Sequence, residues 1–276
     1  MHENDYPVGK MCRIFGVSRS GYYKSKNSTI SKRLAEKKLI QTHIKQIFAD
    51  SGKSYGSPRI QRELLKLDIK CSRPRVARYM KELGLFARKR KKYKHPRDPK
   101  LSAAPDLLDM NFNADNFLEK WTGDITYIKS DSGWLYLTVV IELFNREIVG
   151  YSISREMTAE TTTIPALIMA IKRKGSPQIF HSDRGSQYLC SDYKKLLNED
   201  KKIKQSNSYS CYGNAVTESF FKTLKTEMEK KKFKSLEEAK IELFKWIEIF
   251  YNRKRMHSSL NYLTPEQFEN KAKIIT

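Results

Sequence analysis

Hydrophobic positions in the first third of the chain recur at helical intervals. Over residues 31–48 they fall at helical spacing, and the Gly- and Ser-rich stretch after Asp50 ends this helix. Two more short helices are expected at Ser57-Pro58 and Ser72-Arg73-Pro74, because a capping serine followed by proline favours a first helical turn. Gly84 is expected to end the third helix.

From Trp121 the pattern becomes that of β-strands. Alternating apolar residues flank a hairpin turn at Ser130–Gly133, and a second turn at Asn145-Arg146 leads into Ile148–Ile153, which predicts three consecutive antiparallel strands. A helix, a strand, a helix, a strand and a long helix should follow, at Ala159–Lys172, Gln178–His181, Asp192–Glu199, Ile203–Lys204 and from Asn214 onward. This order is typical of a ribonuclease H-like mixed α/β domain.

The chain is strongly basic, with 53 Lys and Arg against 31 Asp and Glu and a formal net charge of +22. Residues 1–116 hold 27 of these cations but only 11 of the anions. Such a balance indicates a polyanionic partner, and nucleic acid is the first expectation. No run approaches the roughly 18 apolar residues of a membrane span, and the N-terminus lacks a secretory signal pattern. We expect no membrane partner and a cytoplasmic protein with access to DNA.

Pattern and charge together divide the chain into five segments. These are an N-terminal segment (1–30), a helix-turn-helix-like module (31–86), a basic linker (87–116), the ribonuclease H-like core (117–232) and a C-terminal helix and tail packed on the core (233–276). The sequence does not decide whether the small all-α module is a helix-turn-helix or a small bundle with a solvated basic face, because no sequence period reports an interhelical angle.

Basic side chains of the module and linker are candidate DNA contacts. The stretch Arg88–Lys94 carries six positive charges in seven residues and is followed by Pro96 and Pro99, so it is too charged to pack. It is either a solvated tether or a segment that lies on phosphates, and the adjacent basic module favours the second. The candidates here are Arg59, Arg73, Arg75, Arg78, Arg88, Lys89, Arg90, Lys91 and Lys92.

Sulfur and imidazole ligands do not form a zinc pattern. The cysteines Cys12, Cys71, Cys190 and Cys211 contain no Cys-x-x-Cys pair, and the histidines contain no His-Glu-x-x-His motif. Any metal must therefore sit on oxygen ligands.

Three carboxylates occupy positions where the local pattern predicts an apolar or neutral residue. Asp124 lies on the strand that opens the sheet, Asp183 follows the apolar strand Ile179-Phe180, and Glu218 lies on a helix flanked by Val216 and Phe220. Each alone is explained as well by a turn, a cap or the surface. In the predicted order the first and fourth strands are neighbours, so the three can meet.

Converging carboxylates require divalent cations, and hard oxygen ligands select Mg²⁺, with Mn²⁺ as a substitute. Two such ions about 3.5–4 Å apart support in-line displacement at a phosphodiester. The catalytic and metal-ligand candidates are thus Asp124, Asp183 and Glu218. Lys222 and Lys225 follow Glu218 on one helix face, where they either contact DNA or form a solvated face.

Six blocks in order resemble a known family. They are Met11-Cys-Arg-Ile-Phe-Gly-Val-Ser-Arg-Ser-Gly-Tyr-Tyr, Tyr55-Gly-Ser-Pro-Arg-Ile, Trp121-Thr-Gly-Asp-Ile-Thr-Tyr, His181-Ser-Asp-Arg-Gly-Ser-Gln-Tyr, Asn214-Ala-Val-Thr-Glu-Ser-Phe-Phe-Lys-Thr-Leu-Lys and Tyr251-Asn-Arg-Lys-Arg-Met-His-Ser-Ser-Leu. Together they resemble the B-frame transposases of the family whose prototype is insertion sequence three, which are similar to retroviral integrases.

The resemblance implies an integrase catalytic core whose Asp-Asp-Glu triad is Asp124, Asp183 and Glu218, with magnesium as cofactor. It implies terminal inverted repeats and target DNA as substrates, a multimer on DNA, action in the bacterial nucleoid, and an upstream-frame protein as fusion or partner. One departure is that 34 residues separate Asp183 from Glu218, one fewer than usual, with the loop Ser206–Cys211 shortened and Gly213 where an acidic residue is expected.

Two other functions fit parts of this pattern. A ribonuclease H-like nuclease acting on hybrids or junctions would use the same triad, although the basic front module argues against it. A non-catalytic DNA-binding regulator would explain the altered loop. The amphipathic helix Ser235–Arg255 is expected to pack on the core, and the sequence does not decide whether Arg253, Arg255 and His257 are structural or face DNA.

Overall fold

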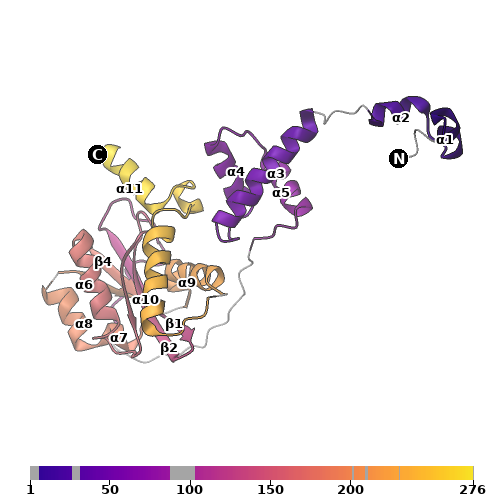
Figure 1. Ribbon diagram of the computed structural model, residues 1–276. Helices are drawn as coiled ribbons and strands as arrows, with labels where there is room; N and C mark the ends of the chain where they lie inside the picture. The colour runs from indigo at the N-terminus through magenta and orange to yellow at the C-terminus, as the bar shows by residue number, and fades with distance from the viewer. Residues whose placement is uncertain are drawn as a thin grey trace. The chain divides into compact units, whose positions relative to one another are not determined.

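The computed structural model describes residues 6–26, 32–87, 103–200, 202–208, 211–229 and 231–275. The chain divides into two compact units (Figure 1). The helical unit is formed by residues 1–50 and 55–86, and the sheet unit by residues 51–54 and 87–276. The five segments inferred from the sequence stay a prediction.

Two short helices in the N-terminal segment have no counterpart in the sequence prediction. They are α1 (Val8–Ile14) and α2 (Arg19–Lys26). The turn after α1 passes through Gly16, whose φ of 64° lies in the left-handed region that glycine adopts without strain. The backbone N–H of Val17 donates to the carbonyl of Cys12 at 3.0 Å and closes this turn. Runs this brief are too short to show a helical period.

The predicted three-helix module is present as α3 (Lys32–Asp50), α4 (Ser57–Lys66) and α5 (Arg73–Glu82). The three helices contact one another, and their fully buried side chains include Ile44, Ile60, Leu64 and Val76. Ser72 occupies the cap of α5 as predicted. The prediction for α4 is wrong by one residue, because Gly56 is its cap and Ser57 begins the helix.

Five strands form one mixed sheet in the sheet unit. They are β1 (Lys120–Ser130), β2 (Gly133–Glu142), β3 (Ile148–Ser154), β4 (Ile179–Ser182) and β5 (Lys204–Asn207), in the order β3-β2-β1-β4-β5. The first three pair antiparallel, whereas β4 runs parallel to both β1 and β5. This is the ribonuclease H-like arrangement that the element order predicts.

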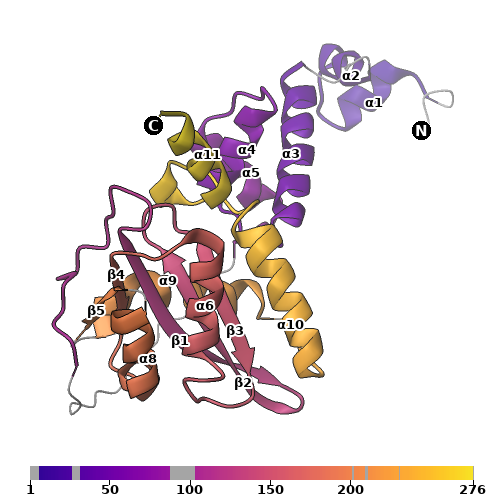
Figure 2. The ribbon, with the colours of Figure 1, turned by 90° about the vertical axis from the view of Figure 1, so that its left-hand side faces the viewer.

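Helices cover both faces of the sheet, and they make three layers (Figures 1 and 2). On one face α6 (Thr163–Lys174), α7 (Ser186–Leu189) and α8 (Ser191–Lys195) enclose a core with Trp121, Val140 and Phe180. On the other face α9 (Ala215–Glu227) and α10 (Leu236–Phe244) pack on Leu137 and Val139. The sheet thus holds its strand ends between two apolar layers.

Several boundaries differ from the prediction. Helix α6 begins at Thr163 rather than Ala159, because the Thr162 hydroxyl donates to the carbonyl of Thr158 and residue 162 leaves the helical conformation. The helix expected at 192–199 is α8 followed by the π-helical turn Leu196–Asp200, and the fifth strand extends to Asn207.

The helix expected at 235–255 is shorter than predicted. It is α10 followed by the π-helical turn Lys245–Tyr251, and a further helix, α11 (Pro265–Ile275), lies in the predicted tail. Within the described ranges, none of these helices has the length and apolar character needed to cross a bilayer.

Candidate active site

Two of the three predicted carboxylates come from neighbouring parallel strands. Thr122 of β1 lies opposite His181 of β4, so two residues further along each chain bring Asp124 and Asp183 to equivalent positions. Asp183 is the first residue after β4. Because adjacent strands lie about 4.8 Å apart, the register places both side chains next to each other at the carboxyl end of β4.

Helix α9 brings the third carboxylate to this end of β4. Its apolar side chains, including Phe220, Phe221 and Leu224, pack on the sheet and fix the helix there. Glu218 lies in its first turn and keeps about a fifth of its side chain exposed. The negative charge of Glu218 acts on Asp124, so the fold brings all three predicted residues into one electrostatic cluster.

The cluster disfavours negative charge. Burial, followed by the charge of Asp183 and then that of Glu218, raises the pKa of Asp124 well above its ordinary value, although the Ile125 N–H donates to its Oδ1 at 2.7 Å. Burial also raises the pKa of Asp183, against the hydrogen bond that Gly185 N–H donates to its Oδ1 at 2.9 Å. Cations bound here would relieve the repulsion among the three carboxylates.

Two lysines of α9 neutralise part of that charge. Lys222 Nζ lies 3.3 Å from Glu218 Oε2, and Lys225 acts on Asp124 while its Nζ lies 4.9 Å from the centre of the Tyr127 ring. Among the described residues, no three His, Cys, Asp or Glu side chains converge closely enough to hold an ion as they stand. In the same structure the Glu218 carboxylate is engaged by Lys222.

A buried polar network fixes the backbone beneath the carboxylates. The Nε2–H of His181 donates to the carbonyl of Gly213 at 2.7 Å, and its Nδ1 lies 2.8 Å from Ser206 Oγ. Asn214 accepts from the Thr122 hydroxyl at 2.6 Å and donates to the carbonyl of Gly123 at 3.0 Å. Strands β1, β4 and β5 are thereby tied to the start of α9.

His181 and Asn214 belong to motifs quoted from the sequence, but sequence reasoning assigned them no role. Both are buried, and burial lowers the pKa of His181 and favours its neutral form. A buried polar side chain must be hydrogen-bonded, so a histidine at the end of an apolar strand was the available signal.

Glycine is required next to Asp124 by close packing. A Cβ on Gly123 would lie 2.6 Å from a ring atom of Phe180 and 3.3 Å from the hydroxyl of Tyr188. The Tyr188 hydroxyl is fully buried, and it has no hydrogen-bond partner within the described part of the chain. Burial raises its pKa well above the ordinary value. The glycine of the Trp-Thr-Gly-Asp motif thus leaves room for the Phe180 and Tyr188 side chains to pack next to the carboxylates.

The glycine at position 213 has a steric explanation. Ser206 and Asn207, expected in a loop, belong to β5, and residues 209–210 lie outside the described residues. A Cβ on Gly213 would lie 1.5 Å from Ser208 Oγ. No side chain fits at position 213 unless Ser208 moves, so the acidic residue expected there and this path of Ser208 exclude each other.

Comparison with known proteins covers both units. The family described as integrase core domain matches residues 116–210, and a second integrase core description matches residues 218–272. The HTH-like domain description matches residues 34–93. Transposase InsF for insertion sequence IS3A of Escherichia coli (strain K12) is 37% identical over 278 residues, covering 98% of this chain and 96% of its own.

One further relative is similar in sequence, and one solved structure is only distantly similar. The 31 kDa protein of insertion element IS600 of Shigella sonnei is 38% identical over 268 residues, 95% of this chain and 98% of its own. The catalytic core domain of HTLV-2 integrase is 18% identical, with a TM-score of 0.42 over 54% of this chain and 95% of that chain. The fold therefore rests on the strand order given above.

This chain belongs to the IS3 family of transposases. The matches place its DNA transposition chemistry in the integrase core that holds the carboxylate cluster. They also make the helical unit an HTH-like domain, so of the two interpretations left open by the sequence the comparison favours helix-turn-helix.

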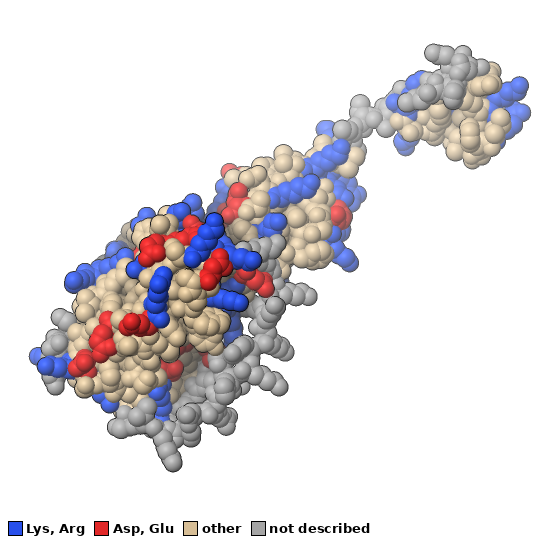
Figure 3. Space-filling model, turned by 60° about the horizontal axis from the view of Figure 1, so that its bottom comes forward, with Lys and Arg blue, Asp and Glu red and all other residues tan. Residues whose placement is uncertain are grey.

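The predicted DNA contacts of the HTH-like domain differ in availability. Arg73 and Arg78 are exposed on α5, and Figure 3 shows basic side chains widely spread over the surface in view. Arg75 donates to the Tyr79 hydroxyl at 2.8 Å and pairs with Glu36 at 2.9 Å, so its guanidinium is engaged within the domain, and its contact with DNA stays a prediction.

Arg59 is partly buried, and its guanidinium lies 5.5 Å from the centre of the Tyr55 ring. The linker candidates Arg88, Lys89, Arg90, Lys91 and Lys92 lie outside the described residues.

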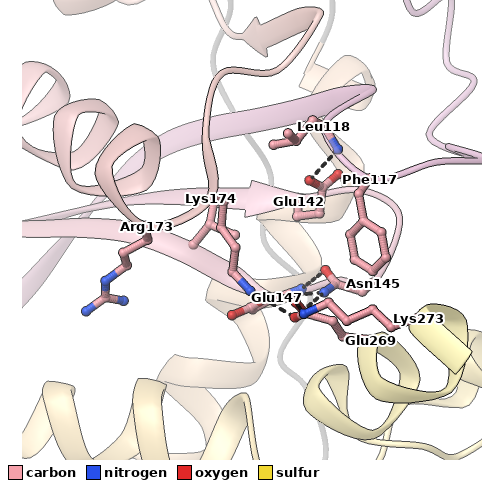
Figure 4. A pocket seen from close by; sticks show the side chains of 10 residues that line it. Phe117, Leu118, Glu142, Asn145, Glu147, Arg173, Lys174, Glu269 and Lys273 are labelled. Carbon is pink, nitrogen blue, oxygen red and sulfur yellow. Dashed lines mark hydrogen bonds and ion pairs between the residues drawn. The ribbon is translucent and has the colours of Figure 1, made fainter.

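The C-terminal segment of the transposase packs on its core through charged contacts. A surface hollow of about 410 Å³ lies between the sheet and α11. Asp124, Asp183 and Glu218 do not line it. In it Lys174 pairs with both Glu147 and Glu269 at 2.8 Å (Figure 4).

Arg255 forms a buried contact, with its Nε 3.1 Å from Glu227 Oε1 and 4% of the residue exposed. Of the two roles that the sequence left open, the structure therefore gives Arg255 the structural one.

Proposed function

We propose that this transposase cleaves and joins DNA at the ends of its insertion sequence, with Asp124, Asp183 and Glu218 as its catalytic carboxylates. The observation that carries the proposal is the parallel register of β1 and β4. It aligns the two aspartates at the carboxyl end of β4, beside the first turn of α9. Raised pKa values at both aspartates mark a site whose charge is incomplete without cations.

The donor set fits Mg²⁺ or Mn²⁺, because it consists of oxygen ligands that repel one another. When bound, two such ions lower the barrier of an in-line phosphodiester displacement by supporting the attacking and leaving oxygens. Asp124 and Asp183 would hold them from the sheet. Glu218 would complete the site after its carboxylate leaves Lys222, which then becomes free to pair with a phosphate.

The remaining residues position the reaction. His181, Asn214 and Gly123 fix the strand ends, so the aspartates keep their spacing when DNA arrives. Lys222 and Lys225 supply positive charge on the same helix as Glu218, where a bound backbone would pass. The HTH-like domain would bind the terminal inverted repeats through Arg73 and Arg78.

Transposition joins two element ends to a target, so we propose that the active form is a multimer assembled on DNA. The relatives are bacterial, and we place this reaction in the bacterial cytoplasm at the nucleoid. An upstream-frame protein, as fusion or partner, would add a second end-recognition module to the HTH-like domain of this chain. Light scattering of the chain with and without end DNA measures the first of these expectations.

The deciding experiment is strand transfer by the purified full chain on labelled DNA carrying the element's terminal repeats. Mg²⁺, Mn²⁺ and EDTA are compared, and Asp124→Asn, Asp183→Asn and Glu218→Gln are set beside Asp192→Asn, an exposed carboxylate of α8. We expect each triad variant to lose about 10²- to 10⁴-fold in rate, since several kcal/mol of charge stabilisation disappear. DNA binding should persist.

Other outcomes would select another function. Binding without any metal-dependent cleavage by the wild-type chain would favour a DNA-binding regulator. Cleavage of arbitrary hybrids that lack the end sequence would favour a nuclease. Activity that survives Asp183→Asn would remove the triad assignment itself.

A further inference from the structure

Two large aromatic side chains lie exposed at the end of the β1–β2 hairpin. Tyr127 is 50% exposed and Trp134 is 55% exposed. Their ring centres are 5.5 Å apart in an edge-to-face contact. By contrast Trp121, on the same strand as Tyr127, is fully buried. Side chains of this size gain from burial, so a pair held in solvent is a candidate contact surface.

The hairpin register explains why the pair is uncovered. Tyr127 lies opposite Tyr136 and Lys129 lies opposite Trp134, so Tyr127 and Trp134 are diagonal neighbours on one face. Strand β4 pairs with β1 only at Lys120–Thr122. The opposite face of the hairpin is covered, because Leu135, which pairs with Ile128, is buried in the core under α9 and α10. The aromatic pair lies on the other face, where both rings stay exposed.

One lysine links the aromatic pair to the carboxylate cluster, although Tyr127 and Asp124 leave β1 on opposite faces. Lys225 joins them, because its Nζ lies 4.9 Å from the centre of the Tyr127 ring and its charge acts on Asp124. Tyr127 follows Asp124 by three residues, which at about 3.3 Å per residue is roughly 10 Å along the strand. Lys129 is exposed beside the pair.

This chemistry suits one class of ligand. Aromatic faces stack on nucleobases while neighbouring cations pair with the backbone phosphates. Bases inside a duplex have both faces covered by their neighbours, so the ligand must be unpaired. At the duplex rise of about 3.4 Å per nucleotide, roughly 10 Å corresponds to about three nucleotides, and an unpaired, more extended strand spans it with no more than that.

We propose that Trp134 and Tyr127 form a stacking platform for an unpaired base within about three nucleotides of the scissile phosphate. The proposal rests on the function proposed above, since it takes the carboxylate cluster as the place of cleavage. The cations decide between a nucleic acid and an apolar protein segment as the occupant, because Lys129 and Lys225 border the rings. With a base stacked on it, the platform holds the DNA terminus unpaired and prevents the two strands from pairing again beside the carboxylates.

The test is equilibrium binding by the full chain in EDTA, so that no cleavage occurs. Two element-end duplexes are compared, one blunt and one with three unpaired terminal nucleotides that carry 2-aminopurine at each position in turn. The variants are Trp134→Ala, Trp134→Phe and Tyr127→Ala, and the control is Phe244→Ala, an exposed aromatic of α10 that is 48% exposed.

We expect the wild type to prefer the unpaired end by about 5- to 150-fold, the range for one stacked base, and to quench one of the three fluorescent positions. Trp134→Ala should lose that preference and the quenching while its binding to the blunt duplex stays within about twofold. Trp134→Phe should retain most of the preference, and Phe244→Ala all of it.

Three results would overturn the proposal. They are a wild type without preference, a Trp134→Ala variant that weakens blunt and unpaired DNA equally, and a variant that changes self-association but not the preference. Because the measurement needs neither metal nor the carboxylates, it stands apart from the strand-transfer test. A wild type that carries out no strand transfer, or an Asp183→Asn variant that still does, would contradict the proposed function, whereas an intact base preference in the same protein would leave the platform in place.

Discussion

Removing the charge of Asp124 should stabilise the sheet unit of the metal-free protein. Burial and the charges of Asp183 and Glu218 raise the pKa of Asp124, so ionised Asp124 destabilises the fold relative to the unfolded chain. Asparagine has the same shape and keeps an Oδ1 acceptor for the Ile125 N–H. Relief of a destabilised active-site group contributes about 0.5–2 kcal/mol, or about 1–8 °C in Tm at about 2–4 °C per kcal/mol.

The pH dependence follows from the direction of the shift. A carboxyl whose pKa is raised by folding binds its proton more tightly in the native state, so its cost is absent below the ordinary pKa and grows as pH rises. The advantage of Asp124→Asn should therefore be largest near pH 8 and vanish toward pH 4. Metal reverses the order, because a ligand at 100 times its Kd stabilises only the wild type, by about 2.7 kcal/mol.

Intrinsic tryptophan fluorescence makes the assay specific. All three tryptophans, Trp121, Trp134 and Trp246, belong to the sheet unit, so a melt excited at tryptophan follows that unit within the full chain. The control is Asp131→Asn, an exposed carboxylate in the hairpin turn. A variant less stable than wild type at pH 8 without metal, or an advantage that grows as pH falls, would refute the electrostatic reasoning.

Three further predictions concern packing around the site. His181→Ala should destabilise the sheet unit by about 1–3 kcal/mol, because Gly213 O loses its buried donor; since burial lowers the pKa of His181, wild-type stability should fall as pH drops below the ordinary histidine value, and the variant's stability measured from pH 7 to 5 should fall less. Arg255→Ala should cost about 3–5 kcal/mol by leaving Glu227 without its buried counter-charge, and urea titration of the double variant Arg255→Ala/Glu227→Gln should recover part of the loss. Lys174 and Lys273 outweigh burial and lower the pKa of Glu269 to about 2, so its stabilisation is present above the ordinary carboxyl pKa and is lost as pH falls toward 2; Glu269→Gln should raise proteolytic cleavage of α11 at pH 7, and equal cleavage of both proteins would contradict this.

Local patterns predicted most of the elements because each depends on nearby residues. Helical spacing over 31–48 and the alternation around Ser130–Gly133 are sufficient for α3 and the hairpin, which register as predicted. The start of α6 was misplaced because threonine hydroxyls compete for backbone carbonyls at 158–162. Helices α1 and α2 were not predicted, since segments of 7 and 8 residues show no clear period, and α11 was left within the predicted tail.

The sequence by itself determined the order of elements, the basic front and the three carboxylates that break their local patterns, because these depend on composition and spacing along the chain. Only the tertiary structure decided which side chains are engaged. Strand register aligned Asp124 with Asp183, and burial assigned Arg255 to Glu227. Through-space charge and hydrogen bonding join residues far apart in sequence, and no pattern along the chain reports such distances.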